Sequence, residues 1–244
     1  EAKLLSGSGN VVVNGGDVSD TVTVTGLTTN NQTFNAQDST SNFNITAGAG
    51  NQTITGSNTG NDSIDGGSGY DTLSYAGGNT IDLTITAFDT QAGGSTGQGT
   101  DTFSSIDNLI GSAGTDVLRG IEAGRDEIAT VNAANAGTFA DVLNTGSFDF
   151  SSFEQLDLNA GNDALAITGN GSLDSSADGG AGTDRLDYSA YAAGPVTVYL
   201  NAGTATAMAR DLIGTAGDSS FEDVYGSAFS DTITGDDTAN VIRG

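Results

Sequence analysis

Large apolar residues recur at a nearly constant interval along this chain. Ile45, Ile54, Ile64 and Leu73 follow one another at steps of nine, ten and nine residues. Residues 21–25 and 80–86 alternate threonine or aspartate with an apolar residue, which is typical of a half-buried β-strand. The pattern therefore predicts an all-β fold made of many short strands.

Glycine and aspartate fill the intervals between these apolar positions. Residues 66–74 fit the nonapeptide G-G-x-G-x-D-x-U-x at every fixed position, where U is a large apolar residue; Asp71 takes the acidic place and Leu73 the apolar one. Residues 57–65 keep Gly60, Asp62 and Ile64. Glycine permits positive φ and hence a tight turn, and the aspartate adds carboxylate oxygens to the carbonyl oxygens of that turn. Such a mixture of oxygens suits a calcium ion.

This tandem resembles the RTX family, the hemolysin-type calcium-binding repeats of secreted bacterial proteins. The resemblance implies a right-handed parallel β-roll or β-solenoid with Gly-Asp turns, in which the U residues fill the core between two parallel sheets. It also implies that calcium ions lie between turns stacked one coil apart. At roughly 18–25 residues per coil, an elongated solenoid of 244 residues would have about 10–13 coils.

Longer repeats predict a single continuous solenoid over residues 1–244. Residues 66–120 return as residues 179–235, shifted by 113 to 115 positions; for example, Tyr75 becomes Tyr188. Residues 121–178 form a degenerate unit between these two copies, and residues 1–65 form a degenerate N-terminal array. Within the middle unit, residues 132–143 are predicted to form either a short helix or a further degenerate rung, and residues 92–99 read as a loop.

The resemblance assigns the metal ligands, position by position, to the glycines and aspartates of the repeats. Asp62 and Asp71 are the strongest candidates, whereas Gln52 and Asn240 occupy the acidic place without a charge. The bland alternative for each aspartate is a side chain that caps its own turn. The candidate set is Asp20, Gly60, Asp62, Gly66, Gly67, Gly69, Asp71, Gly114, Asp116, Gly124, Asp126, Gly161, Asp163, Gly179, Gly180, Gly182, Asp184 and Asp231.

The composition restricts the classes of partner and of chemistry that this chain can use. The chain has 6 Lys and Arg against 31 Asp and Glu, a formal net charge of −25, which argues against nucleic acid as a partner and favours bound cations. It has no Cys and no His, so disulfides and Cys- or His-based zinc sites or catalysis are excluded. No apolar stretch is long enough to predict membrane insertion.

These observations favour a non-catalytic, calcium-binding structural module of a secreted or cell-surface protein, such as an adhesin, a surface layer or an extracellular fibre. RTX proteins leave the cell by type I secretion and fold on extracellular calcium, so the resemblance implies the same here. One alternative is the secretion tail of an enzyme whose catalytic domain lies elsewhere. A glycan-degrading β-helix using a carboxylate pair such as Asp236 and Asp237, and an ice-binding solenoid, are weaker alternatives.

The sequence shows no polar cap at either end of the repeat array. Solenoids usually need capping turns, because a bare end exposes strand edges and core. The sequence therefore leaves two expectations open: the chain is a module cut from a longer array, or its ends dock onto other subunits in head-to-tail self-association, which would build a filament.

Overall fold

The protein is all-β, as predicted. The computed structural model describes residues 3–5, 11–12, 21–27, 32–36, 40–57, 59–122, 124–143, 145–210, 212 and 220–244. In these residues the regular elements are strands and one 3-10 turn, η1 (Leu200–Ala202). No helix long and apolar enough to cross a membrane occurs in this described part. By their contacts the residues divide into two compact units, residues 1–116 with 148–150, and residues 117–147 with 151–244.

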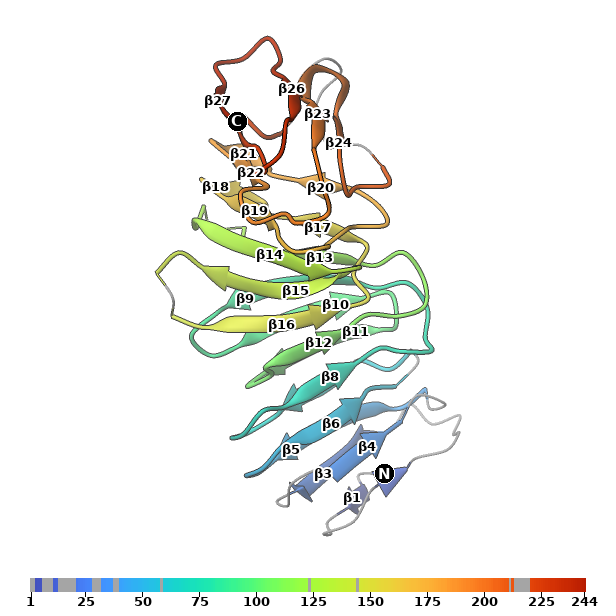
Figure 1. The fold of residues 1–244 in the computed structure, drawn as a ribbon. Coiled ribbons are helices and arrows are strands. Elements are labelled where there is room, and N and C mark those ends of the chain that lie inside the picture. Colours follow the sequence, from blue (N-terminus) through green and yellow to red (C-terminus); the bar gives the residue numbers. More distant parts are fainter. Residues whose placement is uncertain are drawn as a thin grey trace. The chain divides into compact units, whose positions relative to one another are not determined.

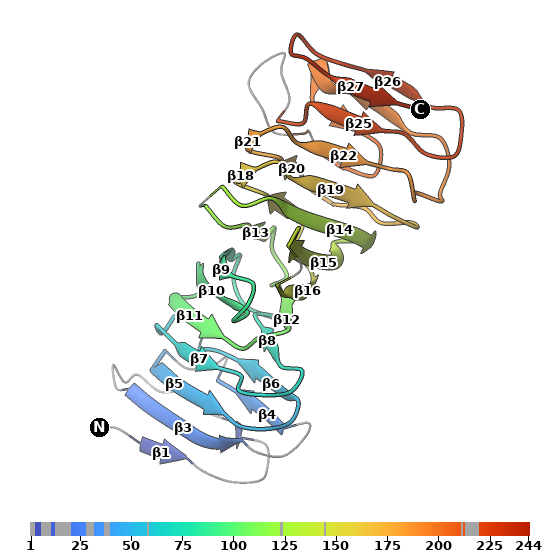
Figure 2. The same ribbon diagram turned by 90° about the vertical axis from the view of Figure 1, so that its left-hand side faces the viewer.

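The first unit contains two sheets of parallel strands. One sheet runs in the order β1 (Lys3–Leu5), β3 (Thr21–Leu27), β5 (Asn42–Ala47), β7 (Ser63–Asp65) and β11 (Thr100–Ser104). The other runs in the order β2 (Val11–Val12), β4 (Gln32–Asn35), β6 (Gln52–Thr55), β8 (Thr72–Ser74) and β12 (Asn108–Ile110), with the middle of β16 (Ser147–Ser151) next to β12. Figure 2 shows the two sheets as separate layers.

Successive strands from β1 to β8 alternate between these two sheets. Each turn of the chain therefore adds one parallel strand to each sheet, which is the winding of a β-solenoid and confirms the predicted fold class. A hydrogen bond from the Gln52 amide to Asp71 spans 19 residues, the length of one uninterrupted coil.

The apolar residues of the period fill the space between the sheets. Ile45, Ile54, Ile64 and Leu73 are all at most 2% exposed. Burying each such side chain stabilises the fold by about 1.5–3 kcal/mol. The regular apolar spacing in the sequence is thus half a coil, the step from an inward-facing position in one sheet to the next such position in the other sheet.

A hairpin interrupts the parallel stacking after β8. Strands β9 (Asp82–Ala87), β10 (Ala92–Thr96) and β11 pair antiparallel. The sequence prediction of a loop over residues 92–99 was therefore wrong for its first half. Gly93 lies against the Phe103 ring, where a Cβ would not fit, so the small residues that suggested a loop allow close packing of a strand.

The second unit repeats the two-sheet arrangement. One sheet holds β13 (Val117–Arg119), β17 (Gln155–Asp157) and β20 (Ala177–Asp178), all parallel. The other runs β15 (Ala136–Asp141), β14 (Glu127–Ala133), β19 (Ala164–Ile167), β22 (Arg185–Asp187), β25 (Asp223–Tyr225) and β27 (Val241–Arg243). Figure 1 labels β14, β15 and β19, and Figure 2 labels all six strands. Two smaller sheets pair β18 (Ala160–Gly161) with β21 (Ala181–Gly182), and β23 (Thr197–Tyr199) with β24 (Thr204–Ala205) and β26 (Thr232–Thr234).

The segment 132–143 is not a helix. It contributes the end of β14 and the whole of β15, which pair antiparallel. Burial alternates along β15, where Gly137, Phe139 and Asp141 face inward. A period of two residues is that of a strand and not that of a helix. Phe139 is fully buried, so packing overrides the alanine-rich composition that suggested a helix.

The two copies detected in the sequence form corresponding strands. Strands β8 and β22 are separated by 113 residues, and β12 and β25 by 115, which are the shifts of the sequence repeat. Tyr75 and Tyr188 are also equivalent. They are 2% and 0% exposed, so both rings pack in the core.

Candidate functional site

The predicted aspartate ligands occupy one recurring position, which we call the acid slot. It lies two residues before the apolar residue at the centre of a short strand, as Asp71 precedes Leu73 and Asp184 precedes Leu186. In this slot the side chain turns inward, and Asp71 and Asp184 are 1% and 0% exposed. Asp62, Asp116 and Asp163 are likewise buried in their slots, whereas Asp231 is partly exposed.

Two predicted aspartates differ from this pattern. Asp20 lies outside the described residues. Asp126 is exposed and accepts a hydrogen bond from the Asn162 amide at 2.7 Å. The buried slot of that coil holds Glu127, two residues before the buried Ala129, because the coil contains one inserted residue. Asp126 as a ligand stays a prediction.

The slot acids of the second unit form a row that crosses neighbouring strands of the sheet, and we call such a row a file. The Glu127 amide donates to Asp163 Oδ1 at 2.6 Å, the Asp163 amide to Asp184 Oδ1 at 2.7 Å, and the Asp184 amide to Glu222 Oε2 at 2.7 Å. Neighbouring parallel strands lie about 4.8 Å apart. Four carboxylates therefore stack at close intervals. Those of Asp163, Asp184 and Glu222 accept an amide of an adjacent coil, and that of Glu127 accepts the Ile121 amide of its own turn.

The first unit holds an equivalent but shorter file. The Gln52 amide donates to Asp71 Oδ1 at 2.7 Å, and the Asp71 amide donates to Asp107 Oδ2 at 2.7 Å. Gln52 therefore occupies the slot with an amide side chain, as its sequence position suggested, and the charge of this file rests on Asp71 and Asp107.

Four slot carboxylates keep one oxygen without a hydrogen-bond partner. These buried oxygens are Asp71 Oδ2, Asp163 Oδ2, Asp184 Oδ2 and Glu127 Oε2. Among the described residues no Lys or Arg forms an ion pair with them. A buried, unsatisfied carboxylate oxygen is costly and calls for an explanation, and an ion is one of the usual ones.

Three other slot carboxylates are satisfied by a serine of their own turn. Asp231 Oδ1 accepts from the Val196 amide at 2.9 Å and from the Ser227 hydroxyl at 2.7 Å, while Oδ2 accepts from the Ser227 amide at 2.7 Å. Asp116 makes the same set of bonds with Ile81 and Ser112. Asp62 makes them with Phe43 and Ser57. Here the capping alternative describes the geometry fully.

Burial raises the pKa of the four unsatisfied acids, and also that of Asp62, where it outweighs the hydrogen bonds from Ser57 and Phe43. Burial, reinforced by nearby acids, raises the pKa of Asp71 to about 6, of Asp163 to about 7 and of Asp184 to about 7. Burial likewise raises the pKa of Glu127 to about 8. For Asp231, burial also acts upward, but the hydrogen bonds from Val196 and Ser227 outweigh it and lower the pKa.

Glycine is required where one turn stacks on the next. Gly67 and Gly180 have φ of +86° and +88°, and a Cβ on either would overlap a backbone carbonyl oxygen of the stacked turn, that of Gly48 or Asn159. Of the other predicted glycines, Gly69, Gly124 and Gly182 have positive φ, whereas Gly60, Gly66, Gly114, Gly161 and Gly179 do not. The positive-φ turns bring carbonyl oxygens close to the coil that follows.

These donors fit a hard divalent cation. Carboxylate and carbonyl oxygens are the ligands that calcium prefers, and Cys and His are absent from the chain. Within the described ranges, no three acidic side chains converge as a ready-made cluster. An ion at an unsatisfied carboxylate would therefore take most of its oxygens from turn carbonyls and water.

Four slot acids were missed from the sequence. Asp101, Asp107, Glu127 and Glu222 each stand two residues before a buried apolar residue, namely Phe103, Leu109, Ala129 and Val224. None follows a complete glycine motif. The shorter pattern, an acid two positions before an apolar strand centre, would have found all four.

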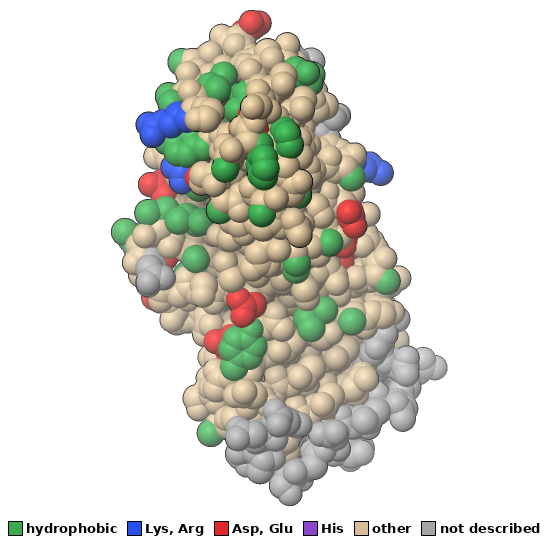
Figure 3. Space-filling view, in the orientation of Figure 1, with side chains coloured by type: hydrophobic (Ala, Val, Ile, Leu, Met, Phe, Trp, Pro, Cys, Tyr) green, Lys and Arg blue, Asp and Glu red, His purple; other side chains and the backbone are tan. Residues whose placement is uncertain are grey.

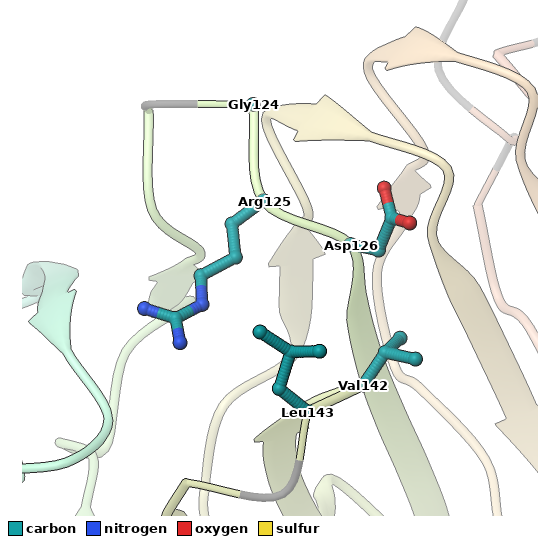
Figure 4. A pocket seen from close by; sticks show the side chains of 5 residues that line it. All are labelled: Gly124, Arg125, Asp126, Val142 and Leu143. Atoms are coloured by element: carbon teal, nitrogen blue, oxygen red, sulfur yellow. The ribbon is translucent and has the colours of Figure 1, made fainter.

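A pocket in the second unit lies beside Asp126. Gly124, Arg125, Asp126, Val142 and Leu143 line it, and Figure 4 shows Arg125 and Asp126 pointing to different sides. The Arg125 guanidinium lies 2.5 Å from Asp141 Oδ2. The pocket contains one carboxylate, so it lacks the facing pair that acid–base hydrolysis of a glycan uses.

Charged side chains are sparse on the visible surface. On the face shown in Figure 3, most atoms belong to backbone or uncharged polar side chains, with acidic side chains scattered among them. Among the residues that the structure describes, in contrast, eight acidic side chains are buried: Asp62, Asp71, Asp101, Asp116, Glu127, Asp141, Asp163 and Asp184.

Comparison with known proteins does not assign this chain to a family. No protein-family model matches the sequence, and no curated protein matches it. The function must therefore be argued from the residues of this chain.

Proposed function

We propose that this chain is a non-catalytic, calcium-binding structural module of a secreted or cell-surface protein, and that it folds on extracellular calcium. The observation that carries the proposal is the set of buried, unsatisfied oxygens on Asp71, Asp163 and Asp184, each at the end of a turn stacked on another turn. A cation between stacked turns would satisfy these oxygens and neutralise their charge.

The charge balance of the chain supports the same proposal. A formal net charge of −25 opposes compaction, and the buried files bring acids together without matching cationic side chains. An ion present at 100 times its dissociation constant stabilises the folded state by about 2.7 kcal/mol per site. A few such sites are comparable with the whole stability of an ordinary domain.

The location is supported by composition and by the resemblance. Secreted repeat proteins of the RTX type meet millimolar calcium only after export, and a chain without Cys can be stapled by ions in place of disulfides. A structural role is supported by the use of the buried carboxylates, which hold neighbouring coils together through backbone amides.

The test compares the chain with calcium and with a chelator. Circular dichroism and thermal unfolding at pH 7.5 should show a large rise in melting temperature with calcium, and calorimetric titration should give a defined number of ions. Asp184→Asn removes one unsatisfied carboxylate and should lower that number, while Asp237→Asn, at an exposed position, is the matched control. An unchanged β spectrum and melting temperature in the chelator would reject the proposal.

A further inference from the structure

Six of the slot carboxylates, those of Asp62, Asp71, Asp116, Asp163, Asp184 and Asp231, fall into two groups that follow the sequence of the turn and not its location. Asp71 and Asp184 are equivalent positions of the two repeat copies, and both keep an unsatisfied oxygen. Asp116 and Asp231 are also equivalent, and both are satisfied by serine. Each kind of turn therefore behaves in the same way in both units.

In the serine turns, one residue supplies two donors. Ser112 and Ser227 stand four residues before the slot acid and Ser57 stands five before it, and each donates both its amide and its hydroxyl. With the amide from the neighbouring coil, both carboxylate oxygens are occupied. These serines are at most 8% exposed, so their hydroxyls are committed to this contact.

In the turns that end at Asp71, Asp163 and Asp184, the residue four positions before the slot acid does not donate to that acid. Gly67, Gly180 and Asn159 stand four residues before Asp71, Asp184 and Asp163, and all three have positive φ, at +86°, +88° and +62°.

The amides of these three residues donate instead to a second acid, six residues before the slot. Gly67 donates to Asp65 at 3.1 Å, Gly180 to Asp178 at 3.0 Å and Asn159 to Asp157 at 3.0 Å. The slot carboxylate therefore accepts neither an amide nor a hydroxyl hydrogen bond from the residue four positions before it. A second carboxylate lies in the same turn and accepts that amide instead.

We propose that the residue four or five positions before the slot acid decides whether a turn takes a cation. A serine there replaces the ion, so the turns ending at Asp62, Asp116 and Asp231 are cation-free. A positive-φ glycine or asparagine whose amide donates to an acid six residues before the slot leaves an oxygen for the ion, so the cation sites are the turns ending at Asp71, Asp163 and Asp184, with Asp65, Asp157 and Asp178 as accompanying acids. Asp101 also follows a positive-φ glycine, but Ser95 stands six residues before it and donates to it, so this turn is not a cation site. This inference rests on the proposed function.

Two matched sets of single variants of the full chain test it. One set is Asp71→Asn, Asp163→Asn and Asp184→Asn; the other is Asp62→Asn, Asp116→Asn and Asp231→Asn. Bound calcium is counted by equilibrium dialysis, with thermal unfolding as a second readout. Each variant of the first set should lose an ion, whereas each of the second should bind as many ions as the parent chain while melting at a lower temperature.

The outcomes separate this inference from the proposed function. If the parent chain binds no calcium, the proposed function fails. If the parent chain binds calcium but the serine-turn variants lose ions as the glycine-turn variants do, only the present inference is overturned.

A measurement on the unsubstituted chain tests the same inference in case some variants do not fold. Trace manganese added to the calcium-loaded parent chain should broaden first the amide resonances of Gln52, Glu127 and Asp163, which donate to the unsatisfied acids. The amides of Phe43, Ile81 and Val196, which donate to the serine-satisfied acids, should broaden later. The reverse order would overturn the inference.

Discussion

A buried carboxylate in the acid slot acts at once as a backbone acceptor and as a charge. Asp163 and Asp184 each accept an amide of the adjacent coil, which ties the coils together. The same burial makes their ionised form costly. The slot therefore couples the pairing of coils to whatever neutralises the carboxylate, either a proton or a cation.

This coupling predicts a pH dependence for the metal-free chain. The folded-state pKa values of Asp163 and Asp184, about 7 each, lie above the unfolded value of about 3.9. A raised pKa contributes stability that is fully present below the unfolded pKa and is lost as the pH rises through the folded pKa. In a chelator, the melting temperature should therefore fall between pH 5 and pH 8.

The variant Asp184→Asn, which cannot ionise, should show a shallower fall over the same range. Saturating calcium should flatten the profile of the parent chain. A melting temperature that rises from pH 5 to pH 8 in the chelator would contradict this assignment.

At the scale of elements, the turns are as constrained as the strands. Gly180→Ala should destabilise the second unit by about 1–3 kcal/mol or more, because the residue has positive φ and the new Cβ meets the Asn159 carbonyl. Gly194→Ala is the matched control, since Gly194 also has positive φ but has no atom near the added Cβ. Urea unfolding should show a clearly larger loss for Gly180→Ala; equal losses would mean that stacking of the turns contributes nothing.

The β14–β15 hairpin makes a second prediction at this scale. Phe139→Ala should cost about 3–5 kcal/mol, because the ring is fully buried. Leu143→Ala should cost little, since that side chain is 75% exposed beyond the end of β15. Chemical denaturation of both variants checks the pair, and a small effect of Phe139→Ala would place the ring outside the core.

At the scale of the whole molecule, site binding must be distinguished from general screening of the charge. Monovalent salt shortens the Debye length to about 3 Å at 1 M and weakens repulsion between exposed acids, but it screens buried groups much less. Sodium chloride should therefore raise the melting temperature of the metal-free chain only modestly. Millimolar calcium at matched ionic strength should raise it far more, and equal effects would mean that calcium acts only as a screening ion.

Much of the fold was predictable because its signals are local and periodic. The apolar spacing from Ile45 to Leu73 places one buried apolar residue in each strand of those coils, since the space between the two sheets must be filled by apolar side chains. The hairpins were not predictable in this way. Their strands pair antiparallel through glycine- and alanine-rich segments, and such composition is equally common in loops and helices.

The sequence by itself determined the all-β class, the coil period and six of the acid slots, those of Asp62, Asp71, Asp116, Asp163, Asp184 and Asp231, because each depends on residue type at a fixed spacing. Only the tertiary structure decided which slot acids are satisfied. That property depends on whether the residue heading the turn donates to the slot acid, as Ser112 does, or turns to another acid, as Gly180 does. The residue at this place is visible in the sequence, but its backbone φ and the acceptor that its amide reaches were decided by the folded turn and by the stacking of one coil on another.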